Sequence, residues 1–174
     1  MTQMRKTIEF KPQLNPADIP VLVTRYGPEN DDEALTTDYR ISEGDYAREH
    51  ISKIFEWKTK GRGRSRLLRN SDEELADALH LAVIAKTERA AVAVLVGLQG
   101  VQVPVASAIL TAIDPTSYTV IDFRALQALG SKSADRTVSF YLAYLNECRR
   151  LAESYEVTLR DLDRALWQWS EEQQ

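Results

Sequence analysis

The sequence predicts an all-α protein, and three observations favour this fold class. Apolar residues recur at intervals of three and four along most of the chain after residue 41. Serine, threonine or proline stands at the start of several of these segments, as is typical of helix N-termini. We find no alternating pattern of the kind that predicts a strand hairpin, and only the first forty residues leave room for strands. We expect about seven helices.

Two regions differ in character. Residues 1–40 contain Pro12, Pro16, Pro20 and Pro28, at intervals too short for long helices, and are expected to form an irregular N-terminal arm. Residues 41–174 are expected to form a single helical domain, which agrees with a total length of 174 residues.

The helices of the second region are predicted from their capping residues and their apolar faces. Ser42 and Asp45 resemble a capping box and place the start of the first helix at Ser42. Ser71 and Glu74 form a clearer capping box at the start of the next one. Further helices are expected over residues 88–98, 104–113, 123–129, about 138–155 and from 158 onward. Gly130 has the position of a residue that ends a helix.

Composition excludes several classes of protein. The single cysteine, Cys148, rules out an internal disulfide, a multi-cysteine zinc site and a cysteine-ligated iron–sulfur cluster. The two histidines, His50 and His80, lack metal-ligand spacing, so no metal site is expected. One thiol suits a reducing compartment, and neither a signal peptide nor a membrane span is recognised. A cytoplasmic protein without a membrane partner is therefore expected.

Charge argues against a protein that binds nucleic acid by its net charge alone. The chain has 22 Lys+Arg and 26 Asp+Glu residues, so its formal net charge is −4. Residues 58–69 are an exception, with six positive charges and no negative one. These charges belong to Lys58, Lys60, Arg62, Arg64, Arg66 and Arg69. Two interpretations stay open for this basic segment: a solvated connecting loop, or a set of phosphate contacts.

Residues 98–129 contain a set of motifs in a fixed order. The first is Leu98-Gln-Gly-Val-Gln102, the second Val103-Pro-Val-Ala-Ser-Ala108, and the third Val120-Ile-Asp-Phe-Arg124. In this order and spacing the segment resembles the helix-hairpin-helix DNA glycosylases, the endonuclease-III-like and 8-oxoguanine-glycosylase-like superfamily. That family's hairpin reads Leu-Pro-Gly-Val-Gly, and a Val-Asp segment carries its catalytic aspartate. The resemblance covers about 32 residues closely.

The resemblance implies a DNA-binding enzyme of base excision. It assigns catalysis to Asp122 and a monovalent cation to the hairpin carbonyls, whereas the lack of a cysteine cluster excludes the iron–sulfur subgroup. It assigns DNA contact to Gly100, Val101 and Gln102 of the hairpin. Arg124, two residues after Asp122, is expected to pair with either a phosphate of the DNA or a carboxylate. Lyase members of the family have a lysine eighteen positions before the aspartate, where this chain has Pro104. A monofunctional glycosylase without lyase activity is therefore expected.

Simpler interpretations exist for the same residues. Asp122 stands where an N-cap residue would stand, and this role is compatible with catalysis. Gln102 replaces the second glycine of the hairpin, which places a side chain where the backbone would approach a phosphate. A catalytically silent nucleic-acid-binding domain and a protein-interaction domain on the same scaffold therefore stay open beside the enzyme. The sequence specifies neither the base removed nor the oligomeric state.

Overall fold

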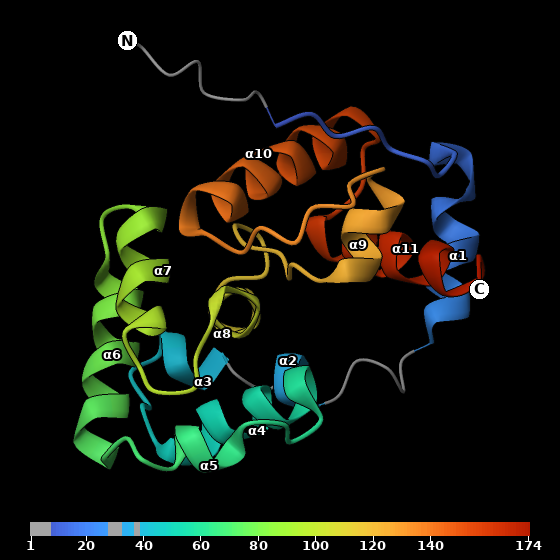
Figure 1. Ribbon diagram of the computed structural model, residues 1–174. Coiled ribbons are helices and arrows are strands. Elements are labelled where there is room, and N and C mark those ends of the chain that lie inside the picture. Colours follow the sequence, from blue (N-terminus) through green and yellow to red (C-terminus); the bar gives the residue numbers. More distant parts are fainter. Residues whose placement is uncertain (1–7, 28–32, 37–38) are drawn as a thin grey trace, which may run out of the picture.

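The computed structural model describes residues 8–27, 33–36 and 39–174, and every regular element within these residues is a helix (Figure 1). The all-α prediction is confirmed for this part of the chain. The elements are η1 (Pro16–Asp18), α1 (Ile19–Tyr26), α2 (Glu33–Thr36), α3 (Tyr39–Ser42), α4 (Arg48–Thr59), α5 (Arg64–Leu67), α6 (Asp72–Ile84), α7 (Glu88–Val96), α8 (Val103–Ile113), α9 (Phe123–Ala128), α10 (Val138–Ser154) and α11 (Leu159–Glu171). The expected number of about seven is not confirmed, because α1 and three four-residue helices add to the predicted ones.

The first forty residues are not uniformly irregular, which corrects the prediction of an irregular arm. Pro16 opens η1 and Pro20 lies in the first turn of α1. Proline is tolerated there because the first turn has no internal acceptor for its missing N–H, so these prolines start helices instead of breaking them. Helix α1 packs against α11, and Arg25 of α1 pairs with Glu172 at 3.1 Å. Pro28 lies outside the described residues.

Helix α4 begins later than expected. Ser42 is the last residue of α3, and α4 starts at Arg48 without a side-chain cap. Asp45 instead accepts a hydrogen bond from the Ala47 N–H within the connecting turn, at 3.2 Å, and pairs with buried His50 of α4 at 2.8 Å. The capping box predicted at Ser42 is therefore wrong, whereas the one at Ser71 and Glu74 is present in full.

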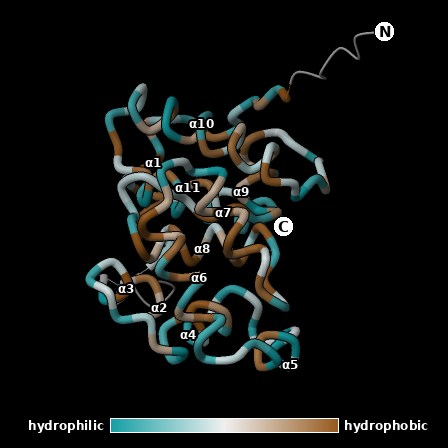
Figure 2. The backbone as a smooth tube through the Cα atoms, turned by 90° about the vertical axis from the view of Figure 1, so that its left-hand side faces the viewer, coloured by the Kyte–Doolittle hydropathy of each residue, from teal (hydrophilic) through white to brown (hydrophobic). Residues whose placement is uncertain are grey.

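Helix α8 forms the centre of the molecule (Figure 2). Nine of its eleven residues are buried, and it packs against α4 and α7. One group of helices, α2 to α7, lies on one side of α8, and α1, α9, α10 and α11 lie on the other (Figure 1). The start of α8 thus faces the space between the two groups.

A short extended segment, residues 119–121, leads from α8 to α9 and is held on both sides. The Tyr141 and Tyr144 hydroxyls of α10 donate to the carbonyls of Thr119 and Val120, at 3.0 and 2.8 Å. The buried Ile121 N–H donates to the hydroxyl of Ser107 on α8 at 3.1 Å. Burial raises the pKa of both tyrosines, so their hydroxyls keep the donated protons. This segment fixes the residue that follows it, Asp122.

Candidate functional site

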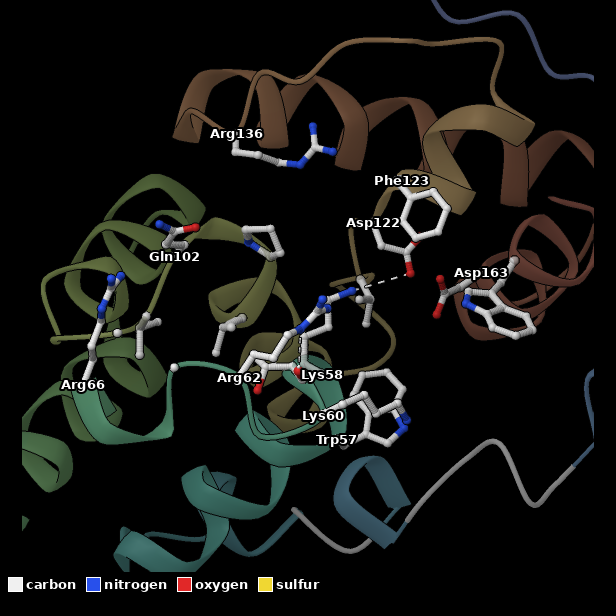
Figure 3. Close-up of a pocket in the computed structure, with 18 of the residues that line it drawn as sticks. Trp57, Lys58, Lys60, Arg62, Arg66, Gln102, Asp122, Phe123, Arg136 and Asp163 are labelled. Carbon is white, nitrogen blue, oxygen red and sulfur yellow. Dashed lines mark hydrogen bonds and ion pairs between the residues drawn. The ribbon is translucent and has the colours of Figure 1, made fainter. Parts of the chain in front are cut away.

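A cleft of about 930 Å³ opens between the two groups of helices (Figure 3). Its walls come from the end of α4 and the basic segment, the hairpin and first turn of α8, and the start of α9. Helix α11, the end of α1 and the segment just before α10 complete them. Six cationic residues line it: Lys58, Lys60, Arg62, Arg66, Arg136 and Arg160. Four aromatic residues line it as well: Tyr26, Trp57, Phe123 and Trp167. Only two of the lining residues are acidic, Asp122 and Asp163, so the cleft is cationic in a chain of net negative charge.

Asp122 is both a helix cap and a cleft residue. Its Oδ1 accepts a hydrogen bond from the Ala125 N–H at 2.9 Å, so the N-cap interpretation is confirmed. Its Oδ2 lies 3.5 Å from the Lys58 ammonium at the end of α4. The Asp122 side chain is 23% exposed, and the hairpin residues Gly100 to Gln102 line the same cleft. The carboxyl is therefore neither sealed in the core nor turned away from the hairpin.

Asp163 is a second acidic residue of the cleft, and the sequence analysis missed it. It lies on α11, its side chain is only 8% exposed, and it pairs with Arg160 one turn earlier. Burial raises its pKa to about 6, the Arg160 guanidinium opposes that rise, and the Asp122 charge adds to it. Figure 3 shows the Asp122 and Asp163 carboxyl groups turned toward one another. Its position among apolar helical residues gave no distinctive signal in the sequence.

The aromatic side chains form one end of the cleft. Trp57 stands at the end of α4 and Trp167 on α11, and both are partly exposed. Tyr26 of α1 packs edge-on against Trp167, with ring centroids 5.4 Å apart. Phe123, next to Asp122, is 61% exposed at the mouth. Partly exposed aromatic faces beside cations are the surfaces on which nucleobases stack.

The structure divides the predicted basic residues into two sets. Lys60, Arg62 and Arg66 are exposed and line the cleft, joined by Arg136, which the sequence analysis did not select. Arg64 pairs with Glu56, and Arg69 is exposed outside the lining. The basic segment is also less irregular than a loop, since it contains α5.

Arg124 lies outside the lining of the cleft. Its guanidinium pairs with Glu171 at 2.5 Å and lies 4.8 Å from the ring centroid of Trp167. Arg124 was expected to pair with a phosphate or a carboxylate, and in the structure it pairs with the carboxylate of Glu171. Arg124 thereby holds the start of α9 to α11 and supports the Trp167 ring from behind the cleft.

The hairpin packs against the basic segment through its glycine. Gly100 has φ +83°, and a Cβ built there would lie 2.9 Å from the Leu67 backbone nitrogen. Val101 is buried, whereas Gln102 is exposed and caps α8 without a side-chain hydrogen bond. The glycine thus allows a close approach to the protein's own backbone at this turn.

Buried Asn70 joins the same two segments. Its amide group donates to the carbonyls of Leu67 and Gln99, and its Oδ1 accepts from the Gln99 N–H, each at 2.9 Å. The Val101 N–H also donates inside the protein, to Leu98 at 3.2 Å. Two hairpin amides, those of Gln99 and Val101, are therefore already bonded inside the protein.

Potential ligands for a metal ion are scarce among the described residues. Within residues 8–27, 33–36 and 39–174, no cluster of three His, Cys, Asp or Glu side chains could hold one. The hairpin carbonyls of Leu98 and Gln99 accept hydrogen bonds from Val101 and Asn70, so a monovalent cation would have to share them. Cys148 is buried on α10, as its apolar position predicted.

Comparisons of the chain with known protein families, with curated proteins and with solved structures give no match. Among the described residues, no helix is both long enough and apolar enough to span a membrane.

Proposed function

We propose that this protein is a divergent, monofunctional DNA glycosylase, which binds DNA at the cleft and hydrolyses the bond between a base and its sugar. One observation carries the proposal. Asp122 and the hairpin preceding α8 line a single cleft that is rich in both cations and aromatic rings. An enzyme of this kind needs a phosphate-binding surface, an aromatic pocket for an extruded base, and a carboxylate beside the sugar. The cleft offers candidates for all three.

Asp122 has the geometry for the chemical step. Breaking the bond between base and sugar builds positive charge on the sugar, and a nearby carboxylate stabilises that charge. The N–H of Ala125 and the held segment 119–121 fix the Asp122 carboxyl, so little reorganisation is needed. Its Oδ2 faces the cleft, where it can also orient a water molecule for attack on the sugar.

The proposal is hydrolytic because Pro104, which also lines the cleft, carries no amine. Because Pro104 cannot form a Schiff base, borohydride treatment during reaction with damaged DNA is expected to trap no covalent complex. The amine of Lys58 also lies close to the Asp122 carboxylate, so the same experiment tests whether Lys58 acts as a nucleophile instead. A trapped complex that Lys58→Ala abolishes would contradict the monofunctional form of the proposal.

Asp122→Asn tests the catalytic role. Asparagine is as good an N-cap as aspartate, so α9 should keep its cap and the protein its stability. We expect release of damaged bases from a panel of lesion duplexes to fall about 10²–10³-fold, with DNA affinity retained. Equal release by the variant would remove Asp122 from the mechanism, and no release by the wild type from any lesion would reject the enzyme.

The exposed cationic residues of the cleft give a second test, through the salt dependence of DNA binding. Replacing Lys60, Arg62 and Arg66 together with alanine is expected to weaken duplex binding and to reduce the slope of log affinity against log salt. The reduction should be about 3 if each cation meets one phosphate. Lys86, Arg89 and Arg150 form a matched control triple, because they lie outside the cleft lining. Equal effects of the two triples would argue against a DNA surface at the cleft.

A catalytically silent nucleic-acid-binding domain is the second candidate. It is favoured by the packing of Gly100 against Leu67, since this turn approaches the protein's own backbone closely. Salt-dependent DNA binding without base release by the wild type would select it. A folded protein that binds neither DNA nor RNA would select the protein-interaction domain instead.

A further inference from the structure

Asp163 is a buried acid that the proposed mechanism does not use. Charged and titratable groups face it from each neighbouring element: Lys58 at the end of α4, Asp122 at the start of α9, and Tyr144 and Cys148 on α10. On its own helix it pairs with Arg160, which lies over the ring of Tyr26 on α1. Even so, Asp163 lines the cleft together with Asp122, and the two carboxyl groups are turned toward one another (Figure 3).

We propose that Asp163 is the general acid of the cleft, which protonates the departing base, and that the cleft accepts neutral bases that cannot leave readily without a proton. The inference rests on the proposed function. It assigns separate tasks to the two carboxyl groups: Asp122 stabilises the sugar as an anion, and Asp163 supplies a proton. Two carboxyl groups in unequal surroundings commonly divide acid and base roles in this way.

The step balances as a hydrolysis. The bond between C1′ and the base nitrogen breaks, and its electron pair goes to the base. The proton of Asp163 passes to a ring nitrogen of the base, which leaves as a neutral molecule. Water forms the new bond to C1′ and gives up a proton to a carboxylate, and exchange with solvent restores the proton of Asp163. The products are a free base and an abasic sugar.

The surroundings of Asp163 support this role. Burial raises the pKa of its carboxyl to about 6, so the acid form is much more abundant near neutral pH than in an exposed aspartate. Above that pKa, the protonated fraction falls about tenfold for each pH unit. The rate on a neutral base should therefore fall as the pH rises through 6.

The test compares two leaving groups. Hypoxanthine in a duplex is neutral and is released more easily when protonated, whereas 7-methylguanine already carries a positive charge and leaves without a proton. Asp163→Asn is expected to lower hypoxanthine release about 10²–10⁴-fold and to remove its dependence on pH near 6. The loss on 7-methylguanine is expected to be far smaller. Asp161→Asn, on the same helix and outside the cleft lining, is the matched control.

Each other outcome overturns the inference. Equal losses on the two bases would indicate a structural role for Asp163, and an unchanged pH profile would exclude it as the acid. If the wild-type protein releases only 7-methylguanine, the proposed glycosylase function stands, but the general-acid role of Asp163 is rejected. Release of neither base, nor of any other, would reject both.

A titration of the wild-type protein gives a readout that does not require activity. The Asp163 carboxyl carbon, followed by NMR, is expected to titrate near pH 6. In Asp122→Asn the pKa of Asp163 should fall, because a neighbouring negative charge has been removed. Titration at the ordinary value of an exposed aspartate would overturn the proposal.

Discussion

Asn70→Ala is expected to lower the free energy of unfolding by about 3 kcal/mol, because a buried side chain with three hydrogen bonds is lost. Each bond contributes about 1 kcal/mol, and the Gln99 N–H would be left without its acceptor. The hairpin and the basic segment should also move apart, so duplex affinity should fall although no cleft residue has changed. Chemical denaturation and a binding titration measure the two effects.

The control for this change is Asn146→Ala. Asn146 is exposed on α10, so its loss should change the free energy of unfolding by less than about 0.5 kcal/mol. A similar small effect for Asn70→Ala would show that its three hydrogen bonds are replaced readily by water. The two segments would then be held together by the apolar contacts of Leu67 and Val101 instead.

Gly100→Ala is expected to destabilise the protein by about 2–4 kcal/mol. The left-handed conformation alone costs about 1–2 kcal/mol for alanine. The added Cβ would also lie 2.9 Å from the Leu67 nitrogen and 3.1 Å from the Arg66 Cβ. The first neighbour is a backbone atom, so the hairpin or α5 must shift. Thermal or chemical unfolding measures the loss.

Gly61→Ala separates the two contributions. Gly61 has a similar φ of +78°, and nothing lies within 4 Å of the Cβ that would be added. Its replacement should cost only the conformational part, about 1–2 kcal/mol. Equal losses at Gly61 and Gly100 would contradict a tight contact between the hairpin and α5.

Local signals in the sequence predicted much of the helical fold. The capping pair at Ser71 and Glu74 and the stop at Gly130 are both present, because each depends only on residues within one turn. Pro20 was misread because a proline that starts a helix and one that breaks it look alike without tertiary context. Whether α1 forms depends on its apolar contact with α11, which is distant in the sequence.

The candidate site was predicted only in part for a similar reason. Asp122, the hairpin and Lys58 could be selected because motif order and local charge are visible along the chain. Asp163 and Asn70 could not, since an aspartate among apolar helical residues and an asparagine after a basic run have no distinctive local pattern. Their roles arise from partners on other segments, such as Asp122 for Asp163 and Gln99 for Asn70.

The attachment of the basic segment to the hairpin has a consequence for ligand capture. A run of six cations separated by glycines would, as a free tether, lose much conformational entropy on becoming ordered around a polyanion. Here Leu67 is buried and Asn70 anchors the end of the run, so most of that ordering has already taken place during folding. The surface is preorganised, and encounter with a polyanion would require side-chain adjustment without rebuilding the main chain.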